Sequence, residues 1–128
     1  MNTRSLLALT LALALTTLAA VGCNKGGGSS PTASYKAAYD AMKNKDTAAF
    51  KKLMTKKDLQ DIEETAKKAG KSSDDMLKDV INAIPLPKSN ESKDEKISGD
   101  KATLQVKNEK DEWETINFVK EDGEWKLK

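Results

Sequence analysis

Histidine is absent from this chain of 128 residues, cysteine occurs once, and Trp, Tyr and Phe occur twice each. Without histidine, the chain can build no Ser-His-Asp triad, no Cys-His pair and no histidine-containing metal site. A single cysteine excludes a disulfide within the chain. The formal charge of +2 gives no electrostatic footprint for nucleic acid. We therefore expect no cofactor and no nucleic-acid partner.

Acidic side chains do not compensate for the missing histidine as metal ligands. The pairs Asp74-Asp75 and Asp111-Glu112 lack the alternate spacing and the glycine of a calcium-binding loop. The sequence therefore predicts no metal site.

The N-terminal segment, residues 1–22, has the pattern of an export signal. Arg4 is its only charged side chain, and the following stretch from Leu6 to Val21 carries no charge over 16 residues. That is fewer than the roughly 20 residues that a membrane-spanning helix needs. We predict a signal peptide, and a permanent transmembrane anchor is the alternative.

The only cysteine, Cys23, follows small residues at the end of this stretch, in Ala20-Val21-Gly22-Cys23. This tetrapeptide resembles the bacterial lipobox, in which the cysteine is acylated and the chain is cut before it. The resemblance implies a lipoprotein anchored in a bilayer by several acyl chains. Asn24, where inner-membrane lipoproteins commonly have Asp, implies the outer membrane if the source has two membranes. The alternative is an unpaired or buried thiol.

Residues 23–30 are rich in Gly and Ser and are expected to form a flexible linker after the acylated cysteine. Residues 31–128 are long enough for one domain and too short for two.

Apolar residues in the first half of that domain recur at helical spacing, which predicts four helices. The four stripes are Tyr35, Ala38, Tyr39 and Met42; Phe50, Leu53 and Met54; Leu59, Ile62, Ala66 and Ala69; and Met76, Leu77, Val80, Ile81 and Ile84. Asp46, Asp58 and Ser72 are expected to start the second, third and fourth helices. Gly70 and Pro85 are expected to end the third and fourth.

After Pro87 the period changes to two, which predicts strands. Asp122-Gly123 is typical of a two-residue hairpin turn, and this turn pairs Lys120 with Trp125 and Phe118 with Leu127. Trp113 and Val119 then fall on the other face, so a bulge or a second covered surface is expected near Trp113. Residues 88–98 are expected to form a loop leading into a short strand, with Ile97 as its core anchor.

Helices followed by an antiparallel meander predict the α+β class, with the helices on one face of the sheet. Residues 31–128 also resemble the small domain of unknown function found on bacterial lipoproteins within the nuclear transport factor 2-like, cystatin-related superfamily. The likeness is carried by residues 35–39, 45–50, 97–104 and 118–127, the last reading Phe-Val-Lys-Glu-Asp-Gly-Glu-Trp-Lys-Leu. The resemblance implies a curved sheet around the helices, forming a cone whose mouth holds a small apolar ligand.

Enzymes of that superfamily place polar side chains inside the cone, and the resemblance makes Tyr35, Tyr39 and Asp40 candidates for such a role. A tyrosine on the first helix can donate a hydrogen bond to an oxyanion. The alternative is that both tyrosines are core aromatics with hydroxyls at the rim and that Asp40 is solvated. We expect Tyr35, Tyr39 and Trp113 to face a ligand, with the 85–96 loop as a border of the site.

Three functional hypotheses follow. The favoured one is a membrane-tethered, non-enzymatic envelope domain that binds a small ligand, a peptide or a protein partner through the concave sheet. The second is a passive structural or stress-associated surface lipoprotein. The third is a small enzyme of the ketosteroid isomerase-like type that uses Tyr35, Tyr39 or Asp40.

Overall fold

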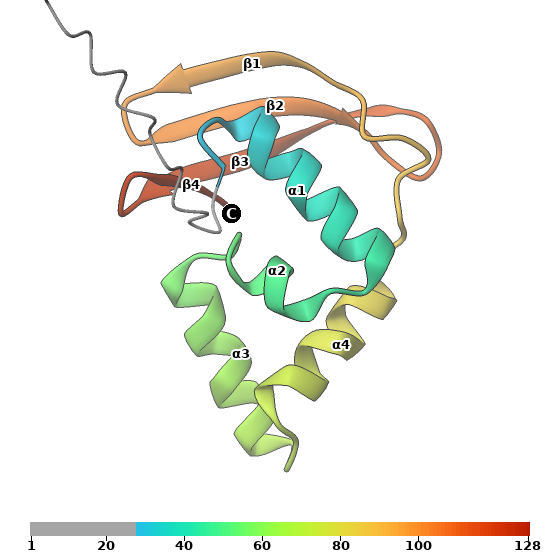
Figure 1. Cartoon of the computed structure of the whole chain (residues 1–128), viewed down its shortest axis with the longest axis vertical. Helices are drawn as coiled ribbons and strands as arrows, with labels where there is room; N and C mark the ends of the chain where they lie inside the picture. The colour runs from blue at the N-terminus through green and yellow to red at the C-terminus, as the bar shows by residue number, and fades with distance from the viewer. Residues whose placement is uncertain (1–27) are drawn as a thin grey trace, which may run out of the picture.

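A computed structural model describes residues 28–128, in which four helices precede a four-stranded antiparallel sheet (Figure 1). The predicted α+β class is therefore confirmed. The strands follow one another in the order β1-β2-β3-β4, and the sheet is open. The predicted signal peptide and Cys23 lie outside the described residues.

Each helix begins at a side chain that caps it. The helices are α1 (Pro31–Asn44), α2 (Thr47–Lys51), α3 (Lys56–Lys68) and α4 (Ser73–Ala83). Their caps are Ser30, Asp46, Thr55 and Ser72, each of which accepts a hydrogen bond from the backbone N–H three residues later. The predicted roles of Asp46 and Ser72 are thus confirmed.

The start of α3 differs from the prediction. Thr55, and not Asp58, caps this helix, and the Thr55 hydroxyl donates to the Asp58 carboxylate at 2.6 Å. Ser72 and Asp75 make the same pair at the start of α4, at 2.8 Å. In the sequence Asp58 looks like the cap because it belongs to the same short capping motif as Thr55.

The sheet consists of β1 (Ser92–Ser98), β2 (Lys101–Lys107), β3 (Trp113–Glu121) and β4 (Glu124–Leu127). The predicted register of β3 and β4 is confirmed, with Phe118 opposite Leu127 and Lys120 opposite Trp125. Asp122 and Gly123 both have positive φ, of 51° and 81°, as a type I′ turn requires. The Lys120 ammonium lies 5.6 Å from the centroid of the Trp125 ring.

The predictions for β1 and for Trp113 need correction. Residues 92–98 form a full edge strand, and Ile97 is 53% exposed, so it does not anchor the core. An edge strand is held by backbone pairing on one side, and β1 shows no burial alternation that a sequence pattern can reveal. The irregularity in the sheet lies between Lys93 and Lys96 of β1, while the pairing of Trp113 with Lys107 is regular.

The domain contains two hydrophobic cores. In Figure 1, α1 lies along one face of the sheet, which we call the inner face, and α3 and α4 extend away from it. The sheet core contains Tyr35, Ala102, Leu104, Val106, Phe118 and Trp125. The helical core contains Ala38, Ala41, Phe50, Leu53, Leu77 and Ile81. Leu127 packs against both cores, so the end of β4 connects them.

The described chain begins with a residue that is fixed to the sheet. The Trp125 N–H donates to the Gly28 carbonyl at 3.3 Å, and the Gly28 N–H donates to the Ser34 hydroxyl at 3.0 Å. That hydroxyl in turn donates to the Trp125 carbonyl at 2.8 Å. A Cβ at Gly28 would lie 2.4 Å from the Ser34 backbone nitrogen, so only glycine fits here. The end of the glycine-rich segment is therefore part of the folded domain.

Candidate ligand-binding groove

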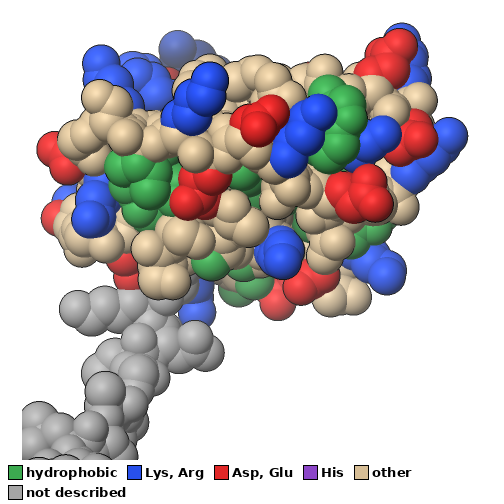
Figure 2. Space-filling view, turned by 90° about the horizontal axis from the view of Figure 1, so that it is seen from above, with side chains coloured by type: hydrophobic (Ala, Val, Ile, Leu, Met, Phe, Trp, Pro, Cys, Tyr) green, Lys and Arg blue, Asp and Glu red, His purple; other side chains and the backbone are tan. Residues whose placement is uncertain are grey.

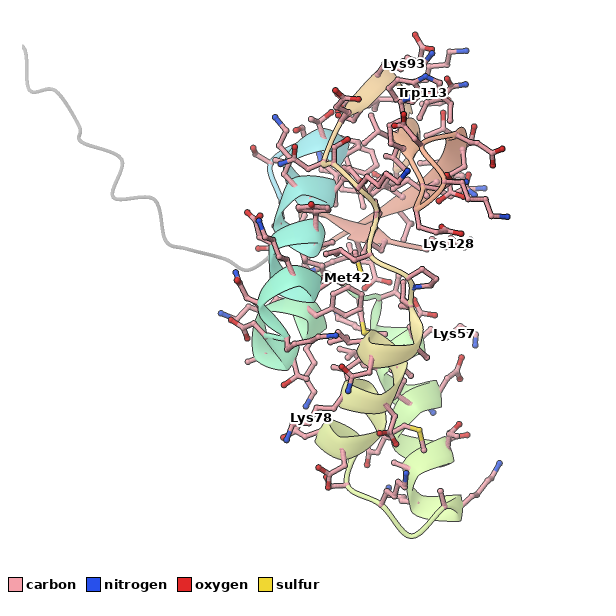
Figure 3. The ribbon with its side chains drawn as sticks, turned by 90° about the vertical axis from the view of Figure 1, so that its right-hand side faces the viewer. Met42, Lys57, Lys78, Lys93, Trp113 and Lys128 are labelled. Carbon is pink, nitrogen blue, oxygen red and sulfur yellow. The ribbon has the colours of Figure 1, made fainter. Side chains whose placement is uncertain are left out.

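An apolar groove of about 290 Å³ opens where α1, the α4–β1 connection and the inner face of the sheet meet. Figure 3 shows Met42 between α1 and this connection. The lining residues are Tyr35, Ala38, Met42, Phe50, Ile84, Pro85, Pro87, Val106, Asn108, Glu109, Glu114, Ile116 and Leu127. Several of them also belong to the two cores or pack against them, so the floor of the groove is held rigidly.

The Tyr35 side chain lines this groove and is 4% exposed. Its hydroxyl is buried, and no residue of the described part of the chain forms a hydrogen bond with it. A buried polar group without a partner costs about 1–3 kcal/mol and is uncommon. Tyr35 therefore holds an unused hydrogen-bonding group, closed off from solvent, in the wall of an apolar groove.

The environment of Tyr35 keeps its hydroxyl protonated. Burial raises the pKa of Tyr35 above its ordinary value, and the nearby Tyr39 hydroxyl and Glu114 carboxylate raise it further. A phenol held in the neutral form is both a donor and an acceptor. It can orient a ligand that carries a carbonyl or hydroxyl group.

The β2–β3 hairpin places the polar rim of the groove. Glu114 lies opposite Val106 in the register of β2 and β3, and so belongs to the inner face. Asn108 fixes the connecting turn, because its side-chain oxygen accepts from the backbone N–H groups of Lys110 and Glu112, both at 2.9 Å. The exposed carboxylates of Glu109 and Glu114 thus lie at the rim, above an apolar floor.

Of the residues predicted to face a ligand, Tyr35 lines the groove, and Pro85 and Pro87 of the predicted border do so too. Tyr39 is half-buried and does not line it. Asp40, the candidate carboxylate of the enzyme hypothesis, is exposed on α1 and is likewise outside the groove.

Trp113 lies on the outer face of the sheet and is 40% exposed. The ammonium groups of Lys93 and Lys107 lie 4.1 and 4.8 Å from the centroid of its ring, and Figure 3 shows Lys93 beside it at the end of the sheet. These distances are typical of cation–π contacts. The structure therefore separates Trp113 from Tyr35.

Sequence reasoning missed Met42, Ile84, Glu109 and Glu114 as groove residues. For Glu114 a signal was present, because in a strand Glu114 shares a face with Ile116 and Phe118. Ile84 was expected to extend the apolar stripe of α4, but it follows the last helical residue and is 41% exposed.

A larger hollow, of about 560 Å³, is lined by residues of the outer face and the β1 edge, including Lys96, Lys101 and Lys128. Seen from the side of β1, side chains of both charge signs lie among apolar ones (Figure 2). Because the lysines of this hollow are exposed and can be solvated individually, it makes a weaker site than the groove.

The acidic pairs of the sequence have structural roles in the described residues. Asp75 belongs to the cap of α4, while Asp74 forms an ion pair with Lys51 of α2. Asp111 has φ 68° in the β2–β3 turn and pairs with Lys107 at 3.1 Å. Within residues 28–128, no group of three or more potential ligands is placed to hold a metal ion.

The helices of residues 28–128 include none with the length and apolar composition needed to cross a bilayer. Comparison of the chain with family models, with curated proteins and with solved structures finds no match. The case for a function therefore rests on the geometry of the groove and on the sequence.

Proposed function

We propose that the protein is a membrane-tethered envelope lipoprotein whose non-enzymatic domain binds a small apolar ligand in the groove. The observation that carries the proposal is an apolar groove of about 290 Å³ that is lined by exposed Ile84 and by Tyr35, whose buried hydroxyl has no partner among the described residues. Binding sites are typically apolar concavities with few polar groups that fix the ligand's orientation. Acylation of Cys23 would supply the tether, and the lipobox-like sequence supports that part.

The architecture is also in keeping with a nuclear transport factor 2-like, cystatin-related domain. In that family a curved sheet wraps around the helices; here β1, β2 and β4 lie against α1, and the groove would correspond to the mouth of the cone. We therefore keep this relationship as part of the proposal. It would place the ligand between α1 and the inner face of the sheet.

Nile red, a neutral apolar dye with a carbonyl acceptor, tests the proposed groove. Its fluorescence should rise saturably with the purified protein. Ile84→Ala should weaken binding about fivefold, because apolar surface at the mouth is lost. Leu86→Ala is the matched control: Leu86 is 40% exposed, Ile84 is 41% exposed, and Leu86 does not line the groove. Equal effects of the two substitutions, or no saturable binding, would contradict the proposal.

Tyr35→Phe separates binding from folding. The free energy of unfolding should stay constant or rise by about 1 kcal/mol, because an unsatisfied buried hydroxyl is removed. Nile red binding should weaken at the same time, because the polar group that orients the dye is lost. Urea denaturation and dye titration measure the two effects, with Tyr39→Phe as the control outside the groove. A large loss of stability would mean that the hydroxyl has a partner in the free protein.

A passive surface lipoprotein would bind no ligand in the groove, so the dye titration also discriminates against that hypothesis. In the enzyme hypothesis the candidate carboxylate is Asp40, which lies outside the groove, and Glu114, the carboxylate that lines the groove with Tyr35, is exposed rather than buried. We therefore favour binding over catalysis.

A further inference from the structure

We infer that the groove selects amphiphiles with a cationic head group over those with an anionic one. The ligand class is a single apolar chain that ends in an ammonium or similar cation. This inference rests on the proposed function of the groove, and it adds the charge of the ligand.

The charges at the groove all have one sign. Of its lining residues only Glu109 and Glu114 are charged, one from the β2–β3 turn and the other from β3. Neither forms a salt bridge with the described residues, and both are exposed. A head group at the mouth would therefore meet two uncompensated carboxylates.

Lysines that neighbour groove residues in the sequence do not line the groove. Lys107 follows Val106, but its ammonium lies on the outer face with Trp113 and Asp111. Lys88 follows Pro87, is exposed and does not line the groove. An anionic head group would thus find no cationic partner among the lining residues.

The environment of Tyr35 agrees with this selection. Burial is the main cause of the raised pKa of Tyr35, and the charge of the Glu114 carboxylate adds to it. Because burial disfavours any charge at the hydroxyl, a charged head group would lie at the mouth, where the negative charge of Glu114 disfavours an anion and favours a cation. The apolar chain would lie along Met42, whose flexible side chain adapts to different chain shapes.

Decylammonium, decanol and decanoate share one chain and differ in the charge of the head group, so they test the inference. Isothermal titration calorimetry at pH 7 and low salt should show decylammonium binding about tenfold more tightly than decanoate, with decanol between them. Decylammonium and decanoate are used below their critical micelle concentrations, and decanol is used below its solubility limit. The ratio should shrink as salt is added, because exposed charges are screened.

The double substitution Glu109→Gln/Glu114→Gln should bring the ratio close to one. The matched control, Glu64→Gln/Asp100→Asn, makes the same change in net charge at residues outside the groove and should keep the ratio. Equal or tighter binding of decanoate, a ratio that survives in Glu109→Gln/Glu114→Gln, or Nile red binding with no binding of decylammonium would overturn the inference and leave the groove as a binding site. Failure of Nile red and of all three ligands to bind would overturn the proposed function as well.

Discussion

At the residue scale, Tyr35 combines a structural role with an unused polar group. Its ring belongs to the sheet core, and its hydroxyl has no partner among the described residues. The helical stripe in the sequence was enough to place Tyr35 on the buried face of α1. Nothing in the stripe indicates whether the hydroxyl is satisfied, because that depends on residues of β3 that lie far away in the chain.

The raised pKa of Tyr35 predicts a late step in the alkaline titration. Absorbance at 295 nm should show a tyrosine ionisation step at a pH above the ordinary tyrosine pKa of about 10, because Tyr35 keeps its proton. Above pH 10 an unfolded Tyr35 loses its proton while a folded one keeps it. The unfolded state then binds fewer protons, so Tyr35 contributes a loss of stability as pH rises. Tyr35→Phe should abolish the later step, and a later step that persists would contradict the assignment.

Substitution of Gly28 should destabilise the fold more than substitution of a glycine in an open turn. Gly28→Ala should lower the free energy of unfolding by about 2–3 kcal/mol, because the new methyl group would overlap the Ser34 backbone. Gly70→Ala is the comparison. A Cβ at Gly70 meets no atom within 4 Å, and the positive φ of 67° alone should cost about 1 kcal/mol. Urea midpoints decide the order, and a smaller effect at Gly28 would contradict the contact with Ser34.

At the element scale, the β3–β4 hairpin was predictable and the β1 strand was not. The Asp122-Gly123 turn fixes a register, and a register fixes which side chains share a face. In β1 the charged residues and the irregularity after Lys93 remove the alternation that identifies a strand. The sequence predicts the cap of α3 three residues too late, at Asp58 instead of Thr55, because the two residues form one capping motif.

The groove was only partly predictable for a similar reason. Its proline border and Tyr35 are local features of the sequence. Ile84, Glu109 and Met42 come together only after α4, the β2–β3 turn and α1 have packed, and no spacing in the chain encodes that contact. Period and turn chemistry therefore locate elements better than they locate the space between them.

Substitutions of the two tryptophans of the sheet should lower the free energy of unfolding by different amounts. Trp125→Ala should cost about 3–5 kcal/mol, because Trp125 is 3% exposed in the sheet core. Trp113→Ala should cost less than about 1.5 kcal/mol, since it loses only partly exposed contacts with Lys93 and Lys107. Urea denaturation followed by far-UV circular dichroism measures both. Similar losses for the two variants would contradict the assignment of Trp113 to the outer face.

At the scale of the whole molecule, two cores meet at Leu127, while α3 and α4 extend away from the sheet. The connection between α2 and α3 is tied to the sheet by the hydrogen bond from the Leu127 N–H to the Leu53 carbonyl, at 2.8 Å. The groove lies close to this junction, with Leu127 among its lining residues. A ligand in the groove would therefore lie against the residue through which the two cores meet.

Anchoring is a property of the whole chain and is tested at Cys23. Cys23→Ser should abolish metabolic labelling with palmitate and release the protein from membranes. Cys23 lies outside the described part of the fold, residues 28–128, whose thermal unfolding should be unchanged. Equal palmitate incorporation in the wild type and the variant would end the lipoprotein proposal.

The hydrogen bonds of Gly28 also set how far the domain can stand from a bilayer. Gly28 follows Cys23 by five positions in the sequence, so even a fully extended chain spans only about 17 Å. In an acylated protein, this short segment would hold the edge of the sheet at β4 close to the bilayer. The 14 residues of α1 are about 21 Å long, and Met42 in the groove is near the end of α1 remote from Gly28. With α1 directed away from the bilayer, the mouth of the groove would face the aqueous compartment and ligands would arrive from solution.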